Sequence, residues 1–123
     1  MGRSWRDGTG TLVVAEGPAV PLEIAASYRA RRRGLLGRDG IGGALLLTPA
    51  NSVHTLGMRF PIDVAHLDRH LRVLAVVTMR PGRIGLLRPR ARHVLEAEAG
   101  AMAGWGLRAG ARVVLTADPA PGA

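Results

Sequence analysis

The pattern of hydrophobic and polar positions predicts a chain built mainly of short strands. It is clearest where Val20, Leu22 and Ile24 alternate with Pro21 and Glu23, as expected for a half-buried strand. Other runs of aliphatic and β-branched residues are bounded by Gly, Pro or Asp, which are frequent at turns. The predicted strands are residues 11–15, 20–25, 44–48, 60–67, 71–79, 93–97 and 112–116, with an edge strand at 84–87 and a short extended piece at 52–56.

Two short helical segments interrupt this strand pattern. Ser27 is a suitable N-cap for a helix that runs from Tyr28 to about Leu36 and that Gly37 would end. Residues 101–107 are expected to form a second short helix or a turn.

The connections between strands indicate the fold class. Residues 16–19 and 68–70 separate pairs of predicted strands and are expected to form hairpin turns. About eight short strands with one or two short helices predict a mostly β fold, either a compact antiparallel sandwich or a small barrel. The chain lacks the regular alternation of strands and helices that is typical of a parallel α/β sheet.

The length of 123 residues fits one domain. We expect an N-terminal extension at 1–10, a single β-rich domain at 11–117 and a disordered tail at 118–123, where Pro, Ala and Gly dominate. The absence of Cys excludes disulfides, thiolate zinc sites and a Cys nucleophile. The sequence has no run of about 18 apolar residues and no apolar signal segment, so we expect a cytoplasmic protein with no membrane insertion.

The formal net charge of +8 allows two interpretations. All 17 basic residues are Arg, and four of them lie between positions 29 and 33, which could clamp a phosphate, an acidic peptide or anionic lipid headgroups. An excess of Arg over Lys is also the composition that a GC-rich genome imposes on any protein, and the four arginines are then a solvated helix face, the interpretation that we favour. Aromatic residues make up only 3% of the chain, too few for the stacking platforms of single-strand binding, so the composition argues against a nucleic-acid partner.

Four segments resemble motifs of one protein family and occur in the same order. These segments are residues 33–38 (RGLLGR), 54–63 (HTLGMRFPID), 94–100 (VLEAEAG) and 106–110 (GLRAG). By these segments the chain resembles the bacterial and archaeal family called domain of unknown function 192, and the match extends over roughly residues 11–116, nearly the whole chain. The resemblance implies a compact β-rich fold with a small helix, and it implies no established activity, substrate or cofactor. Leu36 and Ala111 depart from the family pattern, in which Met and Asp are common, so no polar role is expected at position 111.

Asp63 is the most informative polar residue. Because it lies in a predicted strand with two largely apolar faces, its carboxylate is expected to be at least partly buried. A buried carboxylate needs an ion-pair partner or several hydrogen bonds, and Arg33, Arg38 and Arg59 are available. Asp63 either forms a polar floor for a ligand together with an arginine, or it fixes the fold by capping a turn or pairing with an arginine. We favour the second interpretation.

His54 is the other candidate for chemistry. It could act as a general base with Asp63 or Glu96, contact a ligand, or be an ordinary loop histidine. Glu96 and Glu98 share one face of a predicted strand, where they form either an acidic pair of the glycosidase type or an exposed face that balances nearby arginines. We favour the exposed face.

The four histidines give no metal-binding spacing. Two of them, His66 and His70, flank Asp68 at a predicted hairpin, where side chains are normally solvated. The glycine loop at 40–43 matches neither a Walker loop nor a dinucleotide fingerprint. We therefore predict no metal and no cofactor.

These observations favour a binding function over catalysis. We expect a small domain that recognises an anionic or polar small ligand, or an acidic segment of a partner protein, and we predict no particular oligomeric state. The predicted ligand contacts are Arg33, Arg38, His54, Thr55, Met58, Asp63 and Glu96. One alternative is a hydrolase or lyase that uses His54 with Asp63 or Glu96. The other is an accessory subunit of a larger assembly that acts through its sheet edge or its basic helix.

Overall fold

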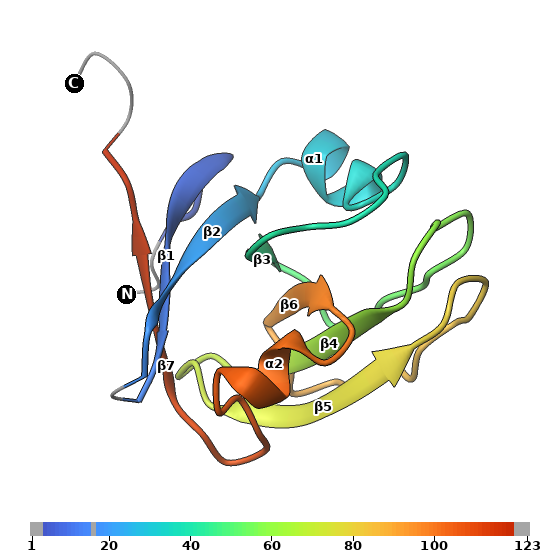
Figure 1. The fold of residues 1–123 in the computed structure, drawn as a ribbon. Helices are drawn as coiled ribbons and strands as arrows, with labels where there is room; N and C mark the ends of the chain where they lie inside the picture. The colour runs from blue at the N-terminus through green and yellow to red at the C-terminus, as the bar shows by residue number, and fades with distance from the viewer. Residues whose placement is uncertain (1–3, 16, 120–123) are drawn as a thin grey trace.

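A computed structural model describes residues 4–15 and 17–119, and within these residues seven strands form one sheet that curls into a half-barrel (Figure 1). The strands are β1 (Gly8–Val14), β2 (Ala19–Ala25), β3 (Ala44–Leu47), β4 (Ile62–Leu67), β5 (Val73–Met79), β6 (His93–Glu98) and β7 (Val113–Ala117). The two short helices are α1 (Tyr28–Arg33), which follows β2, and α2 (Ala101–Gly104), which follows β6. The prediction of a mostly β fold with one or two short helices is confirmed.

The strand order explains how a single sheet becomes a half-barrel. The order is β5-β4-β6-β3-β2-β1-β7, and every pair of neighbours is antiparallel except β2 and β3. The two edge strands approach each other at one end, where Val73 N donates to Ala111 O at 2.8 Å and Val113 N donates to Leu71 O at 3.0 Å. The sheet therefore closes at this end and stays open at the other.

Both faces of the central strands are buried. On the inner face of the curl, side chains such as Leu46, Leu95 and Met102 form one hydrophobic core. On the outer face, Leu45 and Val94 belong to a second core, which residues of α1 and of the segment after β3 cover. Consequently β3 and β4 contain only buried residues, and a polar side chain on either face of them needs a specific explanation.

Several predicted boundaries differ from the structure. The Ser27 cap is confirmed, because its hydroxyl accepts from Ala30 N, but α1 ends at Arg33 and not near Leu36. Gly34 has a φ of 47°, which ends the helix one turn earlier than Gly37 would.

The predicted edge strand at 84–87 is wrong. This part of the chain makes one isolated bridge, between His54 and Ile84, and otherwise runs irregularly beside residues 51–55. The backbone hydrogen bonds that join the two segments are donated by residues 55, 82, 85 and 88, a spacing too uneven for a strand ladder.

The described residues nearest the two chain ends contact the sheet. β1 begins at Gly8, before the predicted domain boundary, and Trp5 packs against the inner core. Asp118 N donates to Thr9 O at 2.9 Å, while residues 120–123 of the predicted tail and Glu16 of the predicted hairpin lie outside the described residues. Neither described helix is long and apolar enough to cross a membrane.

Gly10 is expected to be a sensitive position of β1. It pairs with Leu22 on one side and Ala117 on the other, and a Cβ at this position would collide with the backbone oxygen of Thr116. We expect Gly10→Ala to lower the free energy of unfolding by about 2 kcal/mol, because overpacking displaces backbone. Gly8→Ala is the control, since a Cβ there meets nothing within 4 Å. Urea denaturation measures both variants, and equal stability of the two would contradict the expectation.

Candidate functional site

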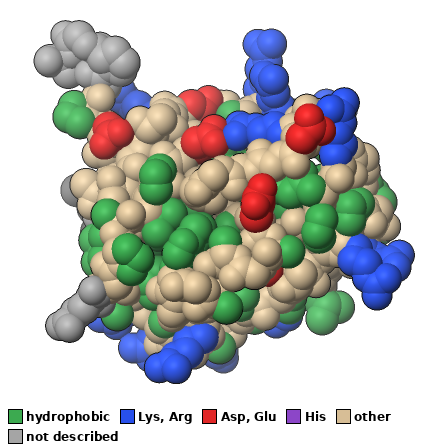
Figure 2. Space-filling model, viewed as in Figure 1, with side chains coloured by type: hydrophobic (Ala, Val, Ile, Leu, Met, Phe, Trp, Pro, Cys, Tyr) green, Lys and Arg blue, Asp and Glu red, His purple; other side chains and the backbone are tan. Residues whose placement is uncertain are grey.

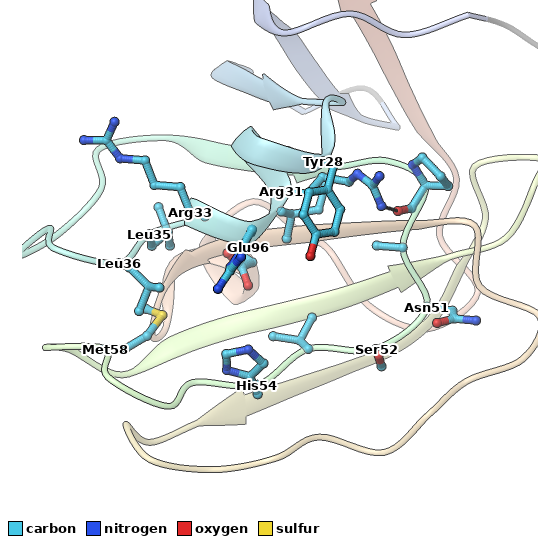
Figure 3. Close-up of a pocket in the computed structure, with 16 residues that line it drawn as sticks. Tyr28, Arg31, Arg33, Leu35, Leu36, Asn51, Ser52, His54, Met58 and Glu96 are labelled. Atoms are coloured by element: carbon cyan, nitrogen blue, oxygen red, sulfur yellow. Dashed lines mark hydrogen bonds between the residues drawn. The ribbon is translucent and has the colours of Figure 1, made fainter.

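A cleft of about 620 Å³ opens between α1 and the segment from Pro49 to Met58, over the outer face of the sheet (Figure 3). Its lining combines basic side chains of α1, apolar side chains and one acidic side chain, Glu96 of β6. Basic side chains also gather over α1 on the surface of the molecule (Figure 2). The cleft is therefore a basic opening that leads to a carboxylate.

Hydrogen bonds at both ends hold α1 over the sheet. At the N-terminal end, Asp7 accepts from Ser27 N at 2.8 Å and from the Ser27 hydroxyl at 2.6 Å. These bonds lower the pKa of Asp7, because they stabilise its ionised form. At the other side of the cleft, Arg31 Nη1 donates to Pro49 O at 3.0 Å. This hydrogen bond connects the wall formed by α1 to the wall formed by the segment after β3.

Glu96 is the most unusual residue of this cleft. It lies between Leu45 of β3 and Val64 of β4, and only 4% of its surface is exposed. Among the described residues, no side chain or backbone group forms a hydrogen bond or ion pair with its carboxylate. Burial therefore raises the pKa of Glu96 to about 7. Near neutral pH the group can both accept and donate a hydrogen bond.

Tyr28 and His54 flank the space into which Glu96 points. In Figure 3 the Tyr28 ring reaches over the cleft from α1, and the His54 ring faces it from the opposite wall. Both side chains are exposed, while Met58 and Leu36 form an apolar wall. The guanidinium of Arg33 points away from Glu96. The site can thus present an acid, an imidazole and a phenol to one bound molecule.

The structure places Asp63 on the inner face of the sheet, away from the cleft. It is 4% exposed, so its predicted burial is confirmed. It forms no ion pair with Arg33, Arg38 or Arg59, so of the two structural roles in the favoured interpretation, pairing with an arginine does not occur and capping a turn does. Instead, Asp63 accepts hydrogen bonds from the Thr78 hydroxyl at 2.7 Å and from the backbone nitrogens of Gly100 and Met102 at 2.8 and 3.2 Å, respectively. A joint site of His54 and Asp63 is excluded, because strand alternation puts Asp63 opposite to Glu96.

Of the other predicted contacts, His54, Met58, Arg33 and Glu96 line the cleft, and Thr55 and Arg38 do not. Thr55 is fully buried, and its hydroxyl donates to Arg80 O at 2.6 Å and accepts from Arg83 N at 2.9 Å. This residue connects two loops.

Arg38 forms a bidentate ion pair with Glu23, with distances of 2.7 and 2.9 Å. The hydrogen bonds from Arg38 lower the pKa of Glu23. Because 38% and 43% of the two side chains are exposed, solvent screens the pair. We expect Arg38→Gln to lower the free energy of unfolding by less than about 1 kcal/mol, and by still less in about 0.5 M salt. Urea denaturation at two salt concentrations tests this, and a salt-independent loss would contradict it.

Two residues differ from their predicted surroundings. Glu96 is buried, so the favoured view of an exposed acidic face holds only for Glu98. His66 is 2% exposed, not solvated, and neither of its ring nitrogens has a partner among the described residues. Burial, followed by the charge of Arg88, lowers the pKa of His66. Arg31 and Arg32 belong to the arginine cluster that was considered for anion binding but favoured as a solvated helix face, and both line the cleft. Tyr28 was not predicted, since only the folded chain brings α1 over Glu96. No group of three or more His, Asp and Glu in the described part of the chain could hold a metal ion.

The fold and the cleft define a small half-barrel domain with a polar cleft on its outer face. Residues 11–115 match DUF192, a family described as "Uncharacterized ACR", and the chain belongs to this family. A UPF0127 protein of Pyrococcus horikoshii, PH1112, is 32% identical over 84 residues, which make up 64% of this chain and 73% of that protein.

Two solved structures share the fold. A protein of unknown function from Novosphingobium aromaticivorans has a TM-score of 0.72 at 19% identity, with 86% of this chain and 83% of that chain covered. A protein from Sinorhizobium meliloti, described as a candidate transcription regulator, has a TM-score of 0.73 at 17% identity, with 92% and 98% covered. These likenesses show the shared architecture and assign no activity to this chain.

Proposed function

We propose that this domain binds a small molecule in the cleft under α1, and that the ligand carries both an anionic group and a hydroxyl or amino group. The observation that supports this most strongly is Glu96, a buried carboxylate that faces the cleft without a partner in the described chain. Burial penalises the charged form of this carboxylate, and the cleft gives a ligand access to it, so a ligand that donates a hydrogen bond would offset the penalty.

The charge and size of the cleft narrow the ligand class. Arg31, Arg32 and Arg33 outnumber the single acid among the lining residues, which favours a ligand with an anionic group at the rim. The hydroxyl or amino group of the ligand would then reach Glu96 at the floor. A volume of about 620 Å³ is in the range of sites for metabolite-sized molecules.

A thermal-shift screen with hydroxy acids, amino acids and sugar phosphates tests the proposal. We expect at least one compound to raise the melting temperature, since a ligand of the folded state stabilises it by mass action. Calorimetry should then show binding at least about tenfold weaker in Glu96→Leu, because a hydrogen bond to a charged group is lost. Glu98→Gln, which changes an exposed acid of the same strand, is the matched control.

Other outcomes would separate this proposal from its alternatives. A screen without any hit, or equal affinity of wild type and Glu96→Leu, would contradict it. An acidic peptide that binds through the arginines alone would be insensitive to Glu96→Leu and would support a protein partner instead.

A second candidate function is catalysis by a hydrolase or lyase that uses His54 with Glu96. It is favoured by the pKa of Glu96, about 7, which suits a general acid or base, and by the position of both side chains in one cleft. Turnover of a bound compound, with a rate that loses its pH dependence near 7 in Glu96→Gln, would support catalysis. Binding without turnover would leave only the binding function.

A further inference from the structure

A second surface, next to the cleft, combines exposed aliphatic and basic side chains. Ile84, Leu86 and Leu87 are 78%, 73% and 63% exposed, and they lie within four positions of one another. We call these three residues the aliphatic strip. Isolated exposed aliphatic residues are common on protein surfaces, but a contiguous group of large ones marks an interaction site.

The charged residues near the aliphatic strip in the sequence are all arginines. Five arginines lie between positions 80 and 92, and no Asp or Glu occurs between positions 69 and 95. Arg80, Arg83 and Arg90 are exposed. A pocket of about 320 Å³ beside the strip is lined by Arg80, Arg83 and Arg88 together with Ile84 and Leu86, and by no acidic residue. The surface therefore offers guanidinium donors and aliphatic contacts at the same place.

From this combination we infer that the aliphatic strip and its arginines dock this domain onto an anionic phospholipid surface. Guanidinium groups bind lipid phosphates, and aliphatic side chains enter the region where headgroups meet acyl chains. A protein partner is less well matched, because the centre of a protein interface is typically rich in aromatic residues and the segment from 80 to 92 has none.

The position of the strip connects it to the rest of the molecule. Figure 1 shows the loop after β5 beside the loop before β4, and the bridge between His54 and Ile84 joins the two. Residues directly opposite in an antiparallel bridge point to the same side of the chain. Ile84 therefore lies next to His54, which lines the cleft. Docking would bring the cleft mouth close to the lipid, although this inference does not depend on the ligand proposed for the cleft.

Vesicle co-sedimentation tests the inference. Vesicles of phosphatidylglycerol mixed with phosphatidylcholine should bind the protein at least tenfold more tightly than vesicles of phosphatidylcholine alone. The net charge of +8 would attract any protein of this kind to an anionic surface, so the decisive variant keeps all charges. Ile84→Ser combined with Leu86→Ser and Leu87→Ser should weaken binding at least tenfold at an unchanged melting temperature.

Two controls separate docking from general charge attraction. Val114→Ser removes an exposed aliphatic side chain of β7 and should leave vesicle binding unchanged. Arg80→Gln with Arg83→Gln and Arg90→Gln should weaken binding more than the equal charge change Arg29→Gln with Arg32→Gln and Arg33→Gln on α1. Undiminished binding of the triple serine variant, equal effects of the two arginine sets, or no binding of wild type to phosphatidylglycerol vesicles would each overturn the inference.

Discussion

The difference in stability between Glu96→Gln and wild type is expected to grow by about 3 kcal/mol, in favour of the variant, as the pH rises from 4.5 to 7. The pKa of Glu96 is about 7 in the folded protein, against 4.5 as its ordinary value in the unfolded chain. Between these two values the folded state binds a proton that the unfolded state does not, so stability falls as pH rises. The loss is about 1.4 kcal/mol per pH unit and stops above pH 7. The Gln side chain of the variant cannot ionise, so the variant does not lose stability in this way as the pH rises.

The comparison with the variant isolates Glu96 from other titrating groups. His66 has a lowered pKa, and its burial in the neutral form reduces stability as the pH falls below 6.5, which is the opposite direction. Because His66 is present in both proteins, its contribution cancels in the difference. Urea denaturation at pH 5, 6, 7 and 8 provides the measurement, and Glu98→Gln is the control with an exposed carboxylate. A difference that stays constant with pH would show that Glu96 is ionised and well solvated in the folded state.

The elements of the fold that local patterns encode were predictable. The alternation of apolar and polar residues around Leu22 and Ile24 predicted β2, and the preference of Ser for helix starts predicted that α1 begins after Ser27. Asp63 was recognised as buried because both faces of its strand are apolar. These features depend on residues that lie next to one another in the sequence, and this is why the sequence suffices.

The candidate site depends on contacts between distant segments. Glu96 is buried because α1 and the segment around His54 cover the outer face of β6, and this arrangement follows from the sheet order rather than from the pattern of β6 itself. The only local signal was the position of Glu96 among Val94, Leu95 and Ala97, which suggests a strand buried on both faces. Similarly, residues 84–87 have the composition of a strand but lie where they pair irregularly with residues 51–55.

A comparison of Glu96 with Asp63 distinguishes a buried carboxylate that is available for function from one that stabilises the fold. Both carboxylates are buried in central strands, but on opposite faces. Asp63 has three hydrogen-bond donors, whereas Glu96 has none among the described residues. Sites that keep a destabilising group are commonly functional ones. The two residues should therefore respond in opposite ways to substitution.

Asp63→Ala is expected to lower the free energy of unfolding by about 3–4 kcal/mol. The substitution leaves the Thr78 hydroxyl and the backbone nitrogens of Gly100 and Met102 without their acceptor. Each unsatisfied buried donor costs about 1–3 kcal/mol, and the more exposed Thr78 and Gly100 recover part of this by binding water. Such a loss is a large fraction of the 5–15 kcal/mol that stabilises a typical domain.

Two further variants distinguish this structural role from a ligand-binding one. Asp63→Asn keeps one acceptor oxygen and should lose only about half as much stability, whereas Asp39→Ala, which removes an exposed carboxylate, should change stability by less than about 0.5 kcal/mol. Urea denaturation gives these values, and amide hydrogen exchange at Gly100 and Met102 shows whether the turn before α2 opens. If Asp63→Asn were as stable as wild type but bound the cleft ligand more weakly, Asp63 would act on the ligand and its hydrogen bonds to α2 would be dispensable. We expect the reverse, because the sheet lies between Asp63 and the cleft.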